Sequence, residues 1–230
     1  MSERGARLLA LDLDGTLVDS APDIAYCLDR ALAAVNCAPP GEARTRAWIG
    51  DGLEMRIARA IAHECGTQEE SAPSLEARQQ AALATFLACY ADNLFVRSRL
   101  YPGVRATLDA LRALRFRLCC ITNKRYAFSD ALLIQAGIRE HFELLIGGDS
   151  CPEKKPSPLQ LQVAAETLGV APAQATLVGD SHQDLRAAHA AGFAFVLAGY
   201  GYGKIDETEL AASPRIGSFA ELPAALGVSA

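Results

Sequence analysis

The sequence predicts an α/β fold, in which a doubly wound, mainly parallel sheet carries an inserted all-helical domain. From residue 104 to 197, helical segments alternate with short apolar runs, which is the pattern of successive βαβ units. Another apolar run, at residues 8–11, predicts a first strand. About a hundred residues separate it from the second predicted strand, far more than a connection through one crossover helix requires. We therefore expect a core formed by residues 1–19 and 101–230, with residues 20–100 as the helical insert.

Composition and charge narrow the class of protein. Half of the 230 residues are hydrophobic, enough for a substantial core, and no apolar run approaches the ~20 residues needed to span a bilayer. No signal-peptide core is present near Met1, and the net charge of −5 argues against a nucleic-acid surface. We expect a cytoplasmic protein with no nucleic-acid or membrane partner, and both a monomer and a homodimer stay open.

The cysteines predict no covalent framework. Seven are scattered along the chain, and none forms a C-x-x-C pair. This pattern is typical neither of a zinc site nor of a disulfide framework, so we expect most of them to be small core residues.

The first apolar run ends in two carboxylates. Residues 8–11 predict a buried strand, and Asp12, Asp14 and Gly15 follow it. Side chains alternate along an extended chain, so both carboxylates should face one side. At ~4 Å and an effective dielectric near 20 their repulsion is roughly 4 kcal/mol, so we expect a bound cation or a shared proton. An acidic turn is the plain alternative; an EF-hand loop is excluded, because its glycine belongs at the sixth position and Gly15 is fourth.

Helical periodicity dominates the insert. Ile24, Leu28, Leu32 and Val35 recur at helical spacing until two prolines at residues 39 and 40 interrupt the pattern. Further helices are expected at residues 53–65 and 75–94, and no part of the insert predicts a strand.

The elements of the core follow in alternation. The predicted helices are 104–114, 126–136, 158–168 and 184–191, and the predicted strands are 116–121, 142–146, 175–178 and 193–197. In doubly wound sheets, ligands bind outside the carboxyl ends of the strands, so the residues just past each strand indicate the site.

Polar side chains stand at these strand ends. Thr122 and Asn123 follow one strand, Lys155 lies in the loop after the next, and Asp180 and Asp184 follow a third. Taken singly, they are also typical of a helix cap, a solvated lysine and first-turn acids. Their convergence on one sheet edge, together with the two acids of the first strand, predicts a catalytic site.

This combination of groups suits phosphoryl transfer. Mg²⁺ prefers oxygen ligands, and Asp12, Asp14 and Asp180 are the predicted ones. A hydroxyl, an amide and an ammonium group would hold the phosphoryl oxygens and neutralise their charge. The predicted phosphate-binding residues are Thr122, Asn123 and Lys155.

These residues resemble the four motifs of the haloacid dehalogenase superfamily. Asp12-Leu13-Asp14-Gly15-Thr16 is similar to motif one, and Thr122, Lys155 and Gly179-Asp180-x-x-x-Asp184 are similar to the other three, in order. The resemblance implies a Rossmann-like core with a helical cap between motifs one and two.

The resemblance also implies the roles of the acids. Asp12 would attack phosphorus and become an aspartyl phosphate, while Asp14 would protonate the leaving alkoxide and then take a proton from the hydrolytic water. Asp14 would bind the metal through its backbone carbonyl and Asp180 through its side chain. Asp184 would bind the metal directly, bind it through water, or orient its neighbours, and Thr16 would support motif one.

A finer resemblance is to the phosphoglycolate phosphatases, at residues 48–52, 101–104, 122–124, 147–149, 154–158 and 199–203. It implies hydrolysis of 2-phosphoglycolate, a small phosphorylated metabolite, to glycolate and phosphate. Arg59, or backbone amides near Gly50, Asp51 and Gly52, would read the substrate carboxylate when the cap closes, and Lys124 belongs to the same group of substrate residues.

Related activities remain as alternatives. A dehalogenase needs no proton for its leaving group, so Asp14 argues against it, and a β-phosphoglucomutase relative typically has an aliphatic residue in place of Thr16. Phosphatases for pyrophosphate, sugar phosphates or amino-sugar phosphates fit the core motifs equally. A non-catalytic binding module is disfavoured, because Asp12, Lys155 and Asp180 are all present.

Overall fold

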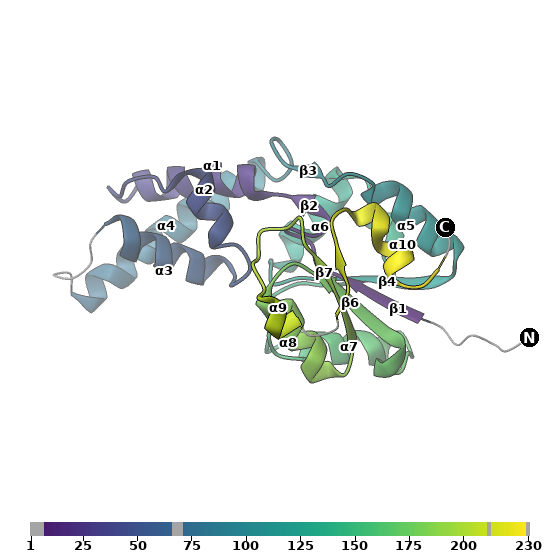
Figure 1. Ribbon diagram of the computed structural model, residues 1–230. Helices are drawn as coiled ribbons and strands as arrows, with labels where there is room; N and C mark the ends of the chain where they lie inside the picture. Colours follow the sequence, from purple (N-terminus) through teal and green to yellow (C-terminus); the bar gives the residue numbers. More distant parts are fainter. Residues whose placement is uncertain (1–6, 66–70, 211–212, 229–230) are drawn as a thin grey trace, which may run out of the picture. The chain divides into compact units, whose positions relative to one another are not determined.

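The computed structural model describes residues 7–65, 71–210 and 213–228. The chain divides into two units, which we call the sheet unit, Met1–Asp19 with Arg99–Ala230, and the helical unit, Ser20–Ser98 (Figure 1). Among the described residues, no helix has both the length and the apolar character needed to cross a membrane.

The sheet unit is built on six parallel strands in the order β5-β4-β1-β6-β7-β8. The strands are β1 Arg7–Leu11, β4 Phe116–Ile121, β5 Leu144–Ile146, β6 Ala175–Gly179, β7 Ala194–Ala198 and β8 Arg215–Ile216. β1 is central, with Ala10 opposite Cys119 of β4 and Leu177 of β6, and its apolar side chains are buried on both faces. The predicted α/β class with a mainly parallel sheet is confirmed.

Helices cover both faces of this sheet, as the βαβ pattern requires. In Figure 1, α7 and α8 lie on one side, and α5 and α10 lie on the other. The helices are α5 Val104–Ala113, α6 Tyr126–Gln135, α7 Leu159–Thr167, α8 His182–Ala191, α9 Glu207–Leu210 and α10 Leu222–Ala225. Leu161 and Ala164 of α7 and Leu185 and Ala188 of α8 join strand residues in one buried apolar cluster.

The helical unit contains α1 Ala21–Ala33, α2 Gly41–Ala47, α3 Leu53–Glu64 and α4 Ala72–Asp92. Ile24, Leu28 and Leu32 of α1 are buried, because their spacing places them on one helix face. α2 was not predicted: it has seven residues and buries only Thr45, so it carries no apolar periodicity.

The expectation about the cysteines is wrong for at least one pair. Cys37 and Cys65 form a disulfide within the helical unit, with Cα atoms 5.0 Å apart. In the same unit the sulfur atoms of Cys27 and Cys89 lie 2.9 Å apart. Cys37 and Cys65 are 28 positions apart in the chain, so the packing of the helices is what brings them together.

The sequence also failed to predict three short strands. β2, Val18–Asp19, pairs with β3, Arg99–Leu100, in an antiparallel ribbon of the sheet unit, and β8 extends the main sheet near the C-terminus. Each has two residues, too few to show the alternation that indicates a strand. The ribbon therefore pairs the segment that leads into the helical unit with the segment that returns from it.

Candidate active site

The end of β1 turns sharply, and the turn places the first two acids. The backbone N–H of Asp12 donates to the carbonyl of Val178 at 2.9 Å, which fixes the strand end against β6. After it, the N–H groups of residues 16, 17 and 18 all point to the carbonyl of Leu13. Gly15 makes this turn possible, because it adopts a φ of 88° that side chains with a Cβ rarely adopt.

Lys155 is the buried cation of the site. Its ammonium donates to Asp12 at 2.7 Å, to Asp184 at 2.5 Å and to the carbonyl of Ile121 at 2.8 Å. Burial lowers the pKa of Lys155, but Asp12 and Asp184 raise it by more, so its pKa lies above the ordinary value. Lys155 is therefore charged at neutral pH, and it links the ends of β1 and β4 to the start of α8.

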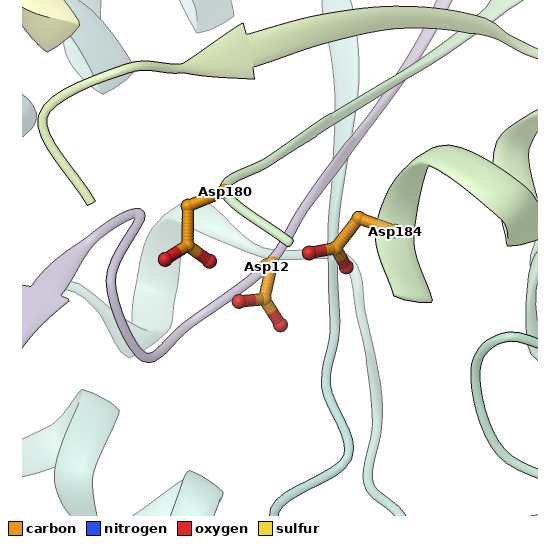
Figure 2. A group of neighbouring side chains, drawn as sticks. All are labelled: Asp12, Asp180 and Asp184. Carbon is orange, nitrogen blue, oxygen red and sulfur yellow. The ribbon is translucent and has the colours of Figure 1, made fainter. Parts of the chain in front are cut away.

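Three buried carboxylates surround this cation. Oxygen atoms of Asp12, Asp180 and Asp184 all lie within 4.8 Å of one another, and Figure 2 shows Asp12 between the other two. Burial raises the pKa of Asp12 well above its usual value; Lys155 opposes this, and the two neighbouring acids add to it. Burial and the charge of Asp184 raise the pKa of Asp180 to about 7.

The donor set of this cluster fits a hard divalent cation. All three side chains offer carboxylate oxygens, which such ions prefer, and a bound cation would relieve the repulsion among them. The structure thus brings Asp12 and Asp180, two of the three predicted metal ligands, together with Asp184. The carboxylate of Asp14, the third, pairs with Lys124, which agrees with a metal role for Asp14 only through its backbone carbonyl.

Asp180 is held by the loop after β7. The N–H groups of Tyr202 and Gly203 donate to one of its carboxylate oxygens at 2.7 and 3.1 Å. A Cβ at Gly15 would collide with this carboxylate, and one at Gly201 would collide with the Cβ of Asp180. The glycines of both loops therefore allow the backbone to approach Asp180 closely.

Asp184 belongs to the N-terminus of α8 as well as to the cluster. It forms a capping box with Ser181: its carboxylate accepts from the Ser181 N–H at 3.1 Å, and its own N–H donates to the Ser181 hydroxyl at 3.3 Å. Its other oxygen accepts from Lys155. Asp184 thus orients the lysine from a helix terminus whose position is fixed.

The predicted phosphate-binding residues lie near one another at the ends of β4 and β5. Thr122 is buried, and its hydroxyl accepts from the N–H of Lys124 at 3.2 Å. The amide of Asn123 donates to the carbonyl of Lys155 at 2.8 Å. Gln160 joins these loops: it accepts from the N–H of Lys155 at 3.1 Å and donates to the carbonyl of Gly147 at 2.8 Å.

Of the other predicted residues, Thr16 lies in the sheet unit, and Arg59 and residues 50–52 lie in the helical unit. Thr16 is fully buried in the sheet unit, and its hydroxyl has no hydrogen-bond partner within the described ranges. Arg59 lies in the helical unit, where it pairs with Asp51 at 2.7 Å, next to Gly50 and Gly52 in the chain.

Sequence reasoning missed Gln160 and Ser181. Gln160 is a fully buried amide near the start of α7, and its partners come from the loops after β4 and β5, so no local pattern marks it. Ser181 carried a usable signal, because Ser-x-x-Asp ahead of an apolar helical run is close to a capping box.

The chain matches known proteins over most of its length. A family model described as haloacid dehalogenase-like hydrolase matches residues 6–192. A phosphoglycolate phosphatase of Nitrosococcus oceani is 43% identical over 195 residues, 85% of this chain and 84% of that protein. One of Chromobacterium violaceum is 39% identical over 222 residues, 96% of this chain and 97% of that protein.

A solved structure agrees with these relatives. A predicted phosphoglycolate phosphatase from Haemophilus somnus 129pt is 35% identical, with a TM-score of 0.89 over 96% of this chain and 98% of that one. The sequence-based prediction of an enzyme of the phosphatase class is confirmed. Since the family model covers most of the chain and the relatives agree with it, the chain belongs to the haloacid dehalogenase-like hydrolases.

Proposed function

We propose that this hydrolase is a Mg²⁺-dependent phosphatase that converts 2-phosphoglycolate to glycolate and phosphate through an aspartyl phosphate on Asp12. One observation carries the proposal: a buried carboxylate at a strand end contacts a buried lysine and lies within 4.8 Å of two further acids. This surrounding supports a nucleophile that must meet an anionic phosphoryl group beside a cation.

Two covalent steps follow from this assignment. An oxygen of Asp12 forms a bond to phosphorus as the ester P–O bond breaks, and Asp14 gives its proton to the leaving alkoxide. Water then attacks the phosphorus, gives a proton to Asp14 and releases phosphate from Asp12. Asp14 thereby recovers the proton that it lost.

The remaining residues neutralise and orient. The side chains of Asp12 and Asp180 and the backbone carbonyl of Asp14 would hold Mg²⁺, with Asp184 as a further candidate ligand, and the ion when bound would polarise the phosphoryl oxygens. The phosphate-binding residues predicted from the sequence, Thr122, Asn123 and Lys155, would bind those oxygens. The Lys155 ammonium, already hydrogen-bonded to Asp12, would attract the phosphoryl group toward the nucleophile.

The substrate is proposed from the relatives and from the chain segments that resemble them. The names of the relatives from N. oceani and C. violaceum point to 2-phosphoglycolate. The helical unit would act as the cap, and Arg59 or the backbone of residues 50–52 would read the substrate carboxylate. Arg59 pairs with Asp51 through one nitrogen, so other guanidinium N–H groups would be the ones that read the carboxylate.

The test is kcat/KM across a panel of small phosphate esters, with Mg²⁺ and after chelation. The panel holds 2-phosphoglycolate, ethyl phosphate, sugar and amino-sugar phosphates and pyrophosphate. We expect the highest value for 2-phosphoglycolate and loss of turnover on chelation. A higher value for another compound would overturn the substrate, and transfer of phosphate to a sugar instead of water would indicate a mutase.

A further inference from the structure

We propose that Lys124 is a positioning residue for Asp14, and that it holds the carboxylate through which protons pass to the leaving group and from water. The inference rests on the proposed function and deepens it. It also assigns Lys124 a different role from the contact with substrate that the sequence suggested.

The contact is close and involves both oxygens of the acid. The Lys124 ammonium lies 2.7 Å from Oδ1 of Asp14 and 2.8 Å from Oδ2. Both side chains are largely buried, with 8% of Lys124 and 11% of Asp14 exposed. Because one nitrogen contacts both oxygens, the ammonium lies near the line that bisects the carboxylate, and it fixes the direction in which the carboxylate points.

The backbone of Lys124 is anchored on three sides. Its N–H donates to the Thr122 hydroxyl at 3.2 Å. Its carbonyl accepts from the N–H of Gly148 at 2.7 Å and from the hydroxyl of Ser129 at 3.3 Å. The loops after β4 and β5 therefore hold the lysine in place, and the flexible stem is the only part left to adjust.

The two acids of the motif thus have separate lysines. Lys155 contacts Asp12, the proposed nucleophile, and Lys124 contacts Asp14, the proposed acid and base. This separation matters because Asp12 and Asp14 are two residues apart, and a single cation between them would pull both toward one point. Lys124 keeps Asp14 available for the leaving group instead.

The experiment measures Lys124→Met and Lys204→Met on two esters. Met keeps an apolar stem of similar length but removes the charge, and Lys204 is an exposed lysine that serves as the matched control. Ethyl phosphate has a poor leaving group that needs a proton, whereas 4-nitrophenyl phosphate needs little proton assistance.

We expect Lys124→Met to lower kcat on ethyl phosphate roughly 10- to 100-fold, which is part of the rate acceleration that a general acid contributes. On 4-nitrophenyl phosphate we expect kcat to fall no more than about 3-fold. In the Asp14→Ala background, Lys124→Met should add little further loss, because the two residues act as one unit. Lys124→Arg should recover part of the rate, and Lys204→Met should match the wild type.

Other outcomes would overturn the inference. Equal losses on both esters would place Lys124 on the transferred phosphoryl group or in a purely structural role. A raised KM for 2-phosphoglycolate alone, with ethyl phosphate unaffected, would make it a substrate-carboxylate residue. If Lys124→Met does not fold, Lys124→Gln replaces it, and a crystal structure in which Asp14 keeps its orientation would also contradict the role. A wild type that hydrolyses neither these two esters nor 2-phosphoglycolate would refute the proposed function itself.

Discussion

Each unit of the chain buries a carboxylate, and the two are treated in opposite ways. Asp23 in the helical unit is fully buried. Its oxygens accept from the backbone N–H groups of Arg97 and Ser98 at 2.8–3.0 Å, from the Ser98 hydroxyl at 2.6 Å and from the Arg97 guanidinium at 3.2 Å, with no second acid among these partners. Asp12 in the sheet unit accepts from Lys155 and faces two more acids. A buried acid surrounded by N–H donors holds the chain, whereas one grouped with like charges is suited to a cation and to chemistry.

The largest expected effect is the loss of kcat when Asp12, the acid proposed for chemistry, is replaced. Asp12→Asn removes the proposed nucleophile, so kcat on 2-phosphoglycolate should fall by roughly 10⁴-fold or more. The midpoint of urea unfolding should stay near that of the wild type, because the change also relieves repulsion with Asp180 and Asp184. A variant that keeps most of its activity would show that Asp12 is not the nucleophile.

Replacing Asp23 should have the opposite result, with a loss of stability and no change in kcat. Asp23→Ala leaves the buried N–H group of Ser98 and the part-buried N–H group of Arg97 without their acceptor, so the free energy of unfolding should fall by about 3–5 kcal/mol. The protein that remains folded should keep its kcat. Urea unfolding measures the loss, with the exposed Asp92→Ala as control; equal effects of the two changes would contradict the holding role.

The disulfide tests whether the helical unit depends on covalent support. Closing a 28-residue segment should contribute about 2–4 kcal/mol, so Cys37→Ser should lower the thermal midpoint of the oxidised protein. Reductant should lower the wild-type midpoint to the same value and leave Cys37→Ser unchanged. A wild type insensitive to reductant would show that the Cys37–Cys65 bond does not stabilise the fold.

The smallest effect concerns pH and the carboxylate cluster. Burial and Asp184 raise the pKa of Asp180 to about 7, so below that pH the carboxyl holds a proton that a cation must displace. Mg²⁺ affinity, measured by calorimetry, should therefore rise up to about tenfold per pH unit toward pH 7 and then level off. Asp180→Asn should bind Mg²⁺ more weakly and with a flatter pH dependence; an affinity independent of pH in the wild type would contradict this prediction.

The sequence predicted the parts of the fold that repeat a pattern. The βαβ alternation predicted the parallel sheet, and Asp12, Lys155 and Asp180 were selected because they follow strands whose ends share an edge. These side chains do meet in the structure. Periodicity and strand-end position can be read from short stretches of sequence, so they do not depend on contacts between distant residues.

What the sequence could not predict depends on partners far apart in the chain. Lys124 and Asp14 are 110 positions apart, and no spacing rule joins them. Gln160 is recognisable only once the loops after β4 and β5 contact it, and Cys37 meets Cys65 only after α3 has packed. Two-residue strands fail for the opposite reason, because they are too short to show any period.

The antiparallel ribbon of β2 and β3 has a consequence for how this chain can change. Val18 lies opposite Leu100 and Asp19 opposite Arg99, so the main chain leaves the sheet unit and returns to it one strand spacing away, about 4.8 Å. A hairpin loop of about two to five residues could span that distance. Residues 20–98 could therefore be exchanged for an insert of another size and shape without moving any strand that carries the acids.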